Sequence, residues 1–212
     1  MHPTGLLSVW NHIAPAHEAE FNAWYEAEHV DERMTVPGFR SARRYRAVGE
    51  TYAYAALYEL DGPEVLQSPA YLDLLAHPTP RTRAIMPHFR EMNRAACHVP
   101  FDSNPAVGAV HHLAILMPDQ APDFPLDSSD DVRIRVAVPD SALTGGATPE
   151  QQLRGSPDTV PAPFVIVESD DLDAVNAAAR QLMKRLAAPA PRMFSLISAR
   201  GTGVVRAAQR SV

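Results

Sequence analysis

The sequence predicts an α+β protein built from two β-α-β-β-α-β units in tandem, with antiparallel sheets packed together as an α/β barrel. In residues 1–101, strand and helix patterns follow one another in this order. Residues 108–212 repeat the order, with the first helix short or missing. A chain of 212 residues, 46% of them hydrophobic, suits one large domain or two half-sized units that share a core.

The first unit opens with a strand at 6–13, and Pro15 ends it. A helix follows at 17–34, because Phe21, Trp24 and Tyr25 share one helical stripe, and the Val-Pro-Gly run at 36–38 breaks it. Two strands, 39–48 and 51–60, read as a hairpin. The remaining predictions are helical segments at 63–76 and 80–94 and a last strand at 95–101. This order is that of the ferredoxin-like unit.

The second unit is predicted to be a degenerate copy of the first, joined to it by a linker at 102–108. Strands are expected at 110–117, 132–138, 163–168 and 193–199, and an amphipathic helix at 171–186. Residues 118–131 are rich in Pro, Asp and Ser where the first unit has its long helix, and 142–161 reads as a polar loop. Each sheet leaves one face open, so packing the two faces together buries both. We therefore expect an internal pseudo-dimer, and a homodimer remains open.

Composition excludes several classes of protein. A formal net charge of −6 argues against a nucleic-acid partner. No apolar run reaches the roughly 18 residues that span a bilayer, so no membrane partner is expected. The N-terminal residues show no signal-peptide pattern, which favours a cytoplasmic protein. The single cysteine, Cys97, excludes an internal disulfide framework and a cysteine-rich zinc site.

Aromatic residues and histidines are concentrated in the first unit. Both tryptophans, all six tyrosines and seven of the nine histidines precede residue 100. Pockets for small molecules favour aromatic linings with a few polar groups. We therefore expect the first unit, 1–101, to carry the site, although a better-packed core would give the same distribution.

Residues 21–45, FNAWYEAEHVDERMTVPGFRSARRY, resemble a pattern of the dimeric α/β-barrel superfamily, and within it the EthD-like branch. The matching features are Trp24, Glu28-His29, the VPGF run at 36–39 and the RRY run at 43–45. Over 1–100 the resemblance is also topological, and over 108–212 it is topological alone. The superfamily includes cofactor-free monooxygenases, isomerases, polyketide cyclases and haem enzymes. The resemblance therefore implies a small-molecule pocket between helices and sheet, and it names no substrate.

His29 is the first candidate for a catalytic residue, with Tyr25 and Glu28 as its partners. A histidine exchanges protons near neutral pH, and Tyr25, four residues earlier, shares its helix face. The alternative is that His29 only bonds the last carbonyls of its helix.

Five further residues are candidates for substrate binding: Trp10, His12, Trp24, Arg43 and Tyr54. Trp10 and His12 share one strand face, which meets either the first helix or the other sheet. Arg43 and Arg44 point to opposite faces, so one of them must turn inward and needs an anion there. A structural ion pair is favoured over a carboxylate substrate. Tyr54 lies in an aromatic stripe that suits a pocket wall or a solvent-side surface.

No metal or cofactor is expected. Glu26 and His29 have the Glu-x-x-His spacing of di-iron bundles, but no second copy of this motif occurs. No motif marks His88 as a haem ligand.

The sequence thus predicts a small-molecule enzyme that performs cofactor-free general acid–base chemistry by dehydration, isomerisation or cyclisation of an organic compound, with aromatic compounds among the candidates. One alternative is a cofactor-independent monooxygenase, which oxygen uptake would reveal. The other is a non-catalytic small-molecule-binding or stress-related accessory protein, in which His29 would only hold the helix to the sheet.

Overall fold

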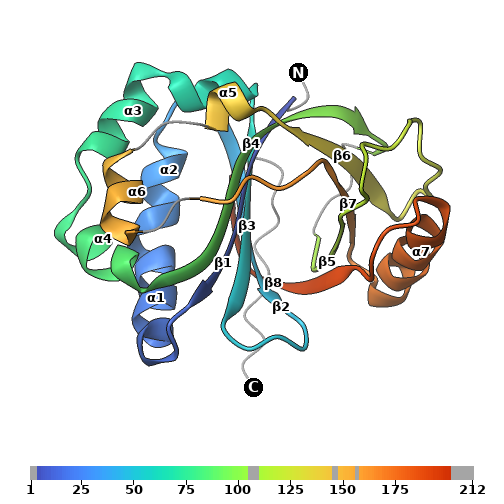
Figure 1. Ribbon diagram of the computed structural model, residues 1–212, viewed down its shortest axis with the longest axis horizontal. Helices are drawn as coiled ribbons and strands as arrows, with labels where there is room; N and C mark the ends of the chain where they lie inside the picture. Colours follow the sequence, from blue (N-terminus) through green and yellow to red (C-terminus); the bar gives the residue numbers. More distant parts are fainter. Residues whose placement is uncertain (1–3, 105–109, 145–147, 156–157, 202–212) are drawn as a thin grey trace.

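The structure, a computed structural model, describes residues 4–104, 110–144, 148–155 and 158–201 (Figure 1). Within these residues, eight strands close into one antiparallel barrel in the order β1-β3-β2-β8-β5-β7-β6-β4. The strands are β1 (Gly5–Ile13), β2 (Phe39–Ala47), β3 (Ala53–Leu60), β4 (Phe89–Asp102), β5 (His112–Leu116), β6 (Arg133–Pro139), β7 (Phe164–Ser169) and β8 (Arg192–Gly201). The predicted α+β class and antiparallel barrel are confirmed.

The two halves of the chain have the same internal strand order. In each half the fourth strand lies beside the first, followed by the third and the second: β4-β1-β3-β2 and β8-β5-β7-β6. Two seams join the halves, one between β2 and β8 and one between β4 and β6. A single chain therefore closes the barrel without a second copy.

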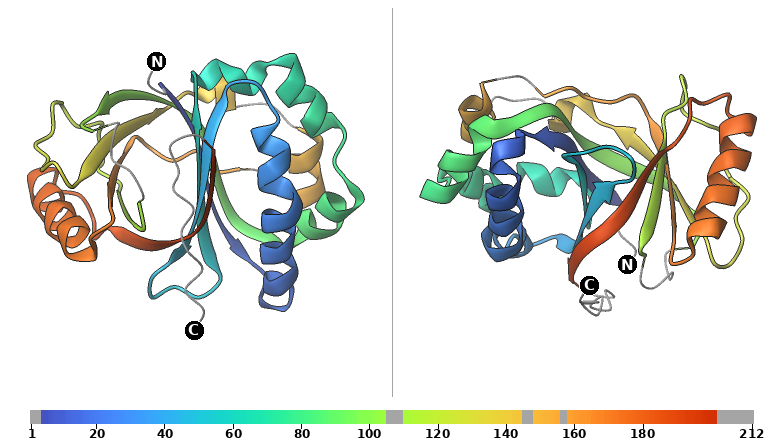
Figure 2. Two further views of the ribbon diagram at one scale, coloured as in Figure 1. Left: turned by 180° about the vertical axis from the view of Figure 1, so that it is seen from behind. Right: turned by 90° about the horizontal axis from the view of Figure 1, so that it is seen from below.

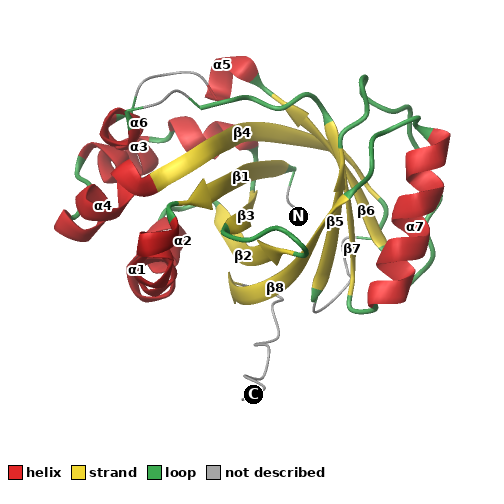
Figure 3. Ribbon diagram, turned by 60° about the horizontal axis from the view of Figure 1, so that its bottom comes forward, coloured by secondary structure: helices red, strands yellow, loops and turns green. Residues whose placement is uncertain are grey.

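The helices are distributed unequally around the barrel (Figures 1 and 2). One side carries α1, α2, α3, α4 and α6, whereas α7 covers the opposite side (Figure 3). The α-helices are α1 (Glu18–Trp24), α2 (Val30–Met34), α3 (Pro69–Ala76), α4 (Pro80–Ile85), α5 (Ser141–Thr144), α6 (Pro149–Arg154) and α7 (Leu172–Arg185). Short 3-10 turns lie at Pro15–His17, Pro63–Gln67 and Met86–His88, and a π-helical turn at Tyr25–His29.

Two sequence predictions are corrected. The helix predicted at 80–94 ends at His88, and β4 begins at Phe89 rather than at 95. Pro87 lacks the N–H that a helix needs, and Phe89 pairs with Ile13 of β1. The loop predicted at 142–161 contains α5 and α6, and a capping box between Thr148 and Gln151 starts α6. Part of the linker predicted at 102–108 lies outside the described residues.

Three apolar clusters follow from the alternation of side chains along the strands. The first, which includes Phe21 and Trp24, lies between the barrel and the helices of the first half. The second, which includes Trp10 and Phe164, fills the barrel interior. The third, which includes Val175, lies under α7. No helix in the described part of the chain is long and apolar enough to span a membrane.

Candidate functional site

The central residue of the candidate site, His29, closes the π-helical turn between α1 and α2. This turn widens the helical spacing, so two preceding aromatic rings reach His29 at once. The Trp24 ring lies 4.2 Å and the Tyr25 ring 4.8 Å from the imidazole, centroid to centroid. The structure thus brings together three of the predicted site residues, Trp24, Tyr25 and His29.

His29 and Tyr25 line a buried cavity of about 40 Å³, which we call the His29 cavity. A space of this size holds a few water molecules and no larger organic molecule. Its walls come from β1, the π-helical turn, α2, β3, α3, β4 and α6. Its lining residues are Leu7, Val9, Tyr25, His29, Arg33, Tyr58, Tyr71, Met86, Phe89, Met92, Arg94, Glu150 and Arg154.

Four residues of this lining carry buried polar atoms without a hydrogen-bond partner. The atoms are His29 Nδ1, Arg33 Nη1, the Tyr58 hydroxyl and Arg154 Nε. All four residues are more than nine-tenths buried. Proteins pair the great majority of buried polar atoms, so four unpaired ones around one cavity indicate a place for a ligand with polar groups.

The charged groups of the cavity are unequal in number. Three arginines line it, whereas Glu150 is the one carboxylate among the described lining residues. Arg33 Nη2 donates to both Glu150 oxygens, at 2.6 and 2.8 Å. Arg94 donates to the Tyr71 hydroxyl at 3.1 Å, and Arg154 pairs with Asp158, which lies behind the lining. The cavity is therefore electropositive.

A larger groove of about 360 Å³ lies on the outer side of Glu150, open to solvent. Its walls are formed by α2 with the turn that follows, by α3 with the residues after it, and by Glu150. Glu150 lines both spaces, so the groove and the His29 cavity adjoin at this residue.

Burial and charge set the protonation states at the site. Burial, with help from Arg33 and Arg44, holds the pKa of His29 well below its usual value, so the imidazole is neutral at pH 7. Burial raises the pKa of Tyr25, although Arg44 opposes this. Burial and then the neighbouring Tyr25 raise the pKa of Tyr58 well above its usual value. Both phenols are therefore protonated hydrogen-bond donors.

Three predicted site residues lie near the cavity without lining it, and one of them is Trp24, which packs on His29. Glu28 is half-buried and accepts a hydrogen bond from Thr79 at the start of α4. Tyr54 packs on Phe21, and its hydroxyl contacts Asn22 at 3.0 Å and Glu18 at 2.5 Å. Glu28 and Tyr54 fix the position of the helices on the barrel.

The other three predicted binding residues turn away from the His29 cavity. Trp10 faces the barrel interior, where its ring meets Phe164 edge-on at 4.8 Å. His12 lies near the end of β1 and pairs with Glu91 at 2.9 Å. Arg43 also points into the barrel, and it pairs with Glu59 at 3.2 Å. Side chains alternate along β1 and β2 between the barrel interior and the helix side. The sequence analysis had left open which of these two faces the residues occupy.

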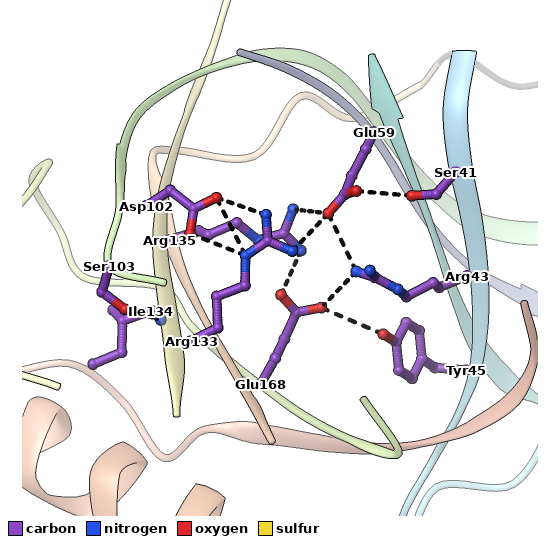
Figure 4. A network of polar contacts seen from close by, with 10 residues as sticks. All are labelled: Ser41, Arg43, Tyr45, Glu59, Asp102, Ser103, Arg133, Ile134, Arg135 and Glu168. Atoms are coloured by element: carbon purple, nitrogen blue, oxygen red, sulfur yellow. Dashed lines mark hydrogen bonds and ion pairs between the residues drawn. The ribbon is translucent and has the colours of Figure 1, made fainter. Parts of the chain in front are cut away.

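Arg43 belongs to a set of polar residues that we call the barrel-interior cluster (Figure 4). Its charged members are Arg43, Arg133, Arg135, Glu59, Glu168 and Asp102, and Ser41 and Tyr45 bond to them. Positive and negative groups are equal in number. Burial alone would raise the pKa of Glu59, but Arg135, Arg43 and Arg133 hold that pKa well below its usual value. This cluster ties the two halves together inside the barrel.

Arg33 and Glu150 are lining residues that the sequence analysis did not select, whereas Tyr58 belongs to the predicted aromatic stripe that includes Tyr54. Arg33 is four residues after His29 and shares its helix face, which was a usable signal. The Thr148–Gln151 capping pattern marked a helix carrying Glu150. Nothing in the sequence placed that helix beside Arg33, 117 residues away.

Among the described residues, no group of three or more His, Cys, Asp or Glu side chains is arranged to hold a metal ion. His88, the residue weighed as a haem ligand, stacks on His17 with ring centroids 3.4 Å apart, outside the His29 cavity.

Comparison with known proteins supports the fold. No protein-family model matches the sequence, and no curated protein matches it. An anthrone oxidase-like protein superposes with a TM-score of 0.55 at 11% identity, covering 96% of this chain and 94% of that one. A "putative monooxygenase" from Lactobacillus acidophilus NCFM has a TM-score of 0.53 at 7% identity, covering 97% and 100%.

A second "putative monooxygenase", from Fusobacterium nucleatum subsp. nucleatum ATCC 25586, has a TM-score of 0.52 at 9% identity, covering 98% of this chain and 99% of that one. At such low identity the likeness extends to the fold alone. It covers nearly the whole chain.

Proposed function

We propose that the protein is a small-molecule enzyme in which His29 removes a proton from an organic substrate that lies mainly in the adjoining groove and places its reacting group in the His29 cavity. The observation that carries this proposal is the set of four buried, unpartnered polar atoms around one cavity, with His29 Nδ1 among them. A substrate with oxygen atoms would supply the missing partners. On the pattern in residues 21–45, we also propose that the chain belongs to the EthD-like branch.

The protonation state of His29 limits the reaction. A neutral imidazole accepts a proton, but a histidine with a strongly lowered pKa is a weak base. The proton it removes must therefore be acidic, as on a phenol, an enol or a carbon beside a carbonyl group. The protonated Tyr58 hydroxyl, which has no protein partner, would donate to the oxygen on which negative charge develops.

Tyr25 and Glu28 complete the proposed catalytic set in different ways. The Tyr25 phenol lines the cavity and orients the substrate oxygen. Glu28 is a positioning residue: it accepts the hydroxyl proton of Thr79, the Thr82 hydroxyl donates to Thr79 Oγ1 at 3.1 Å, and Thr82 accepts from the Trp24 indole at 3.1 Å. Since Trp24 packs on His29, this chain of contacts fixes the imidazole.

Oxidation by O₂ is the second candidate, and the names of the fold neighbours favour it. One neighbour is named for anthrone oxidation and two for monooxygenation. The first step would be the same, because an anion made by proton removal is what O₂ oxidises. In that reaction a CH₂ group and one O₂ become a carbonyl group and one water.

Anthrone, which has an acidic CH₂ group, is a suitable minimal probe. Without oxygen and in D₂O, the wild-type protein should speed deuterium exchange at that CH₂, and His29→Gln should slow the exchange by about 10²–10⁴-fold. The exposed His111, which pairs with Asp170, gives the matched control His111→Gln, which should not change the rate. In air, oxygen uptake would separate oxidation from dehydration, isomerisation or cyclisation. Equal rates for wild type and His29→Gln would refute the role of His29 and favour a non-catalytic binding protein.

A further inference from the structure

We propose that Arg33 is the anchor for a carboxylate group of the substrate, and that Glu150 of α6 occupies this anchor until the substrate displaces it. The inference deepens the proposed function, since it names the substrate class: an organic carboxylate. It concerns binding, and it is therefore testable without turnover.

The geometry of the Arg33–Glu150 pair leaves part of the guanidinium unused. Both hydrogen bonds come from Nη2, whereas Nη1 is buried and has no partner. A guanidinium binds a carboxylate best through two parallel N–H bonds from two nitrogens. Arg33 can therefore hold a freely oriented carboxylate through both Nη1 and Nη2, whereas Glu150 engages Nη2 alone.

Glu150 occupies the position that an entering ligand must take. It is in the first turn of α6, which lies beside α3 and α4 (Figure 1), and it is the wall shared by the groove and the His29 cavity. Withdrawal of its side chain would join the two spaces. The groove alone already has a volume typical of small-molecule sites, which occupy roughly 300–1,000 Å³.

The charges around the anchor favour this exchange. Arg33, Arg94 and Arg154 line the cavity against the single carboxylate of Glu150. Asp158 pairs with Arg154, and Glu32 and Asp73 face the outer groove rather than the cavity. Removing Glu150 alone would leave the buried Arg33 charge uncompensated, which is strongly unfavourable. A ligand carboxylate avoids that penalty because Arg33 exchanges one carboxylate for another.

The test uses 2-naphthoate and its neutral counterpart, 2-naphthalenemethanol, with affinities measured by calorimetry. The wild type should bind 2-naphthoate at least about tenfold more tightly than the alcohol. Glu150→Gln removes the competing carboxylate, so 2-naphthoate should bind about tenfold more tightly again, whereas the affinity for the alcohol should not change. The melting temperature of Glu150→Gln should be lowered, and 2-naphthoate should restore it.

Asp127→Asn is the matched control, since it removes one carboxylate from an exposed ion pair with Arg185 and changes the net charge equally. It should bind both compounds like the wild type. If Glu150→Gln binds 2-naphthoate no more tightly than the wild type does, Glu150 is not the competing group and the proposal is overturned.

The double variant Arg33→Gln/Glu150→Gln leaves no buried unpaired charge from this pair. It therefore tests whether Arg33 binds the carboxylate even if Glu150→Gln does not fold. It should bind the two compounds equally; a retained preference for 2-naphthoate would contradict the anchor. The result of this binding test does not depend on the result of the deuterium-exchange test. A preference for 2-naphthoate without His29-dependent exchange refutes only the catalysis, and the reverse result refutes only the anchor.

Discussion

Adjacent residues of β2 carry guanidinium groups into two different regions of the molecule. Arg43 points into the barrel-interior cluster, whereas Arg44 lies on the helix side, 4.1 Å from the Tyr25 ring centroid and paired with Glu26. In the cluster, three arginines face three carboxylates, and every charged group contacts an opposite charge. In the His29 cavity, three arginines face one carboxylate, and neutral groups such as the Tyr58 hydroxyl lack partners.

This difference separates a structural role from a binding role. Both regions are buried and rich in arginine, so composition and burial do not tell them apart. The balance of positive and negative groups distinguishes the two regions. The charges of the barrel-interior cluster balance one another, although Arg135 Nε also lacks a hydrogen-bond partner, whereas the His29 cavity combines unpaired polar atoms with an excess of arginines. The predictions below test whether the two regions respond differently to substitution and to pH.

The largest effect is expected in the barrel-interior cluster. Glu168→Ala leaves Arg135 and Arg43 without a carboxylate that lies 2.6 and 3.6 Å from them. Removing one partner of a buried ion pair costs about 3–5 kcal/mol, so the free energy of unfolding, measured with urea, should fall by that amount. Asp127→Ala breaks an exposed pair and should cost at most about 1 kcal/mol. Equal losses in the two variants would contradict the structural role of the cluster.

The second prediction concerns acid. The folded-state pKa of Glu59 is well below its value in the unfolded chain, so its contribution to stability is complete above about pH 4.3. As pH falls below that value, Glu59 becomes protonated in the unfolded state but stays ionised in the folded state. Because of Glu59, the free energy of unfolding should then fall by up to about 1.4 kcal/mol per pH unit. Glu59→Gln should be less stable at pH 7, and its unfolding free energy should fall less steeply between pH 4.3 and 3; identical slopes would exclude Glu59 as the cause.

The third prediction applies the same reasoning to His29 at milder pH. Because its folded-state pKa is lowered, the contribution of His29 to stability is complete above its unfolded pKa of about 6.5. It is lost as pH falls from 6.5 towards the folded pKa, with a slope of at most about 1.4 kcal/mol per pH unit. His29→Gln should flatten the stability profile between pH 7.5 and 5.5, as measured by urea unfolding. An unchanged slope in His29→Gln would contradict the assignment of this pH dependence to His29.

The smallest effect distinguishes two buried tyrosines. The Tyr45 hydroxyl donates to Glu168 at 3.4 Å, whereas the Tyr58 hydroxyl has no partner. Tyr45→Phe should therefore cost about 1 kcal/mol, and Tyr58→Phe should be neutral or slightly stabilising. Thermal unfolding of the two variants provides the measurement. A loss for Tyr58→Phe as large as that for Tyr45→Phe would show that the two hydroxyls are equally well bonded.

Local patterns predicted most of the strands, and they failed where tertiary contacts decide. The strands at 6–13 and 39–48 and the helix at 171–186 were predicted within two residues, because alternation and helical spacing are local signals. The start of β4 was missed, since its pairing with β1 overrides the helical pattern up to residue 94. The π-helical turn has no local signature, so the joint contact of Trp24 and Tyr25 with His29 was not foreseeable.

The candidate site was predicted in part for the same reason. His29 and Tyr25 lie four residues apart on one helical segment, so this spacing brought the two together in the prediction. Glu150 reaches the cavity from the second half of the chain, and residue spacing in the sequence does not predict such a long-range contact. The sequence required either Arg43 or Arg44 to point inward. The structure shows that Arg43 does, because it pairs there with Glu59 of β3 and Glu168 of β7.

Closing the barrel within one chain has a consequence for symmetry. A barrel formed by two identical chains would repeat every feature twice, and a change that favoured one site would alter both. Here the seams β2–β8 and β4–β6 join halves with different sequences, so a substitution in one half leaves the other half unchanged. Residues from the second half are then free to become part of the first half's cavity, as Glu150 has. Such a chain would bind one equivalent of 2-naphthoate per barrel rather than two.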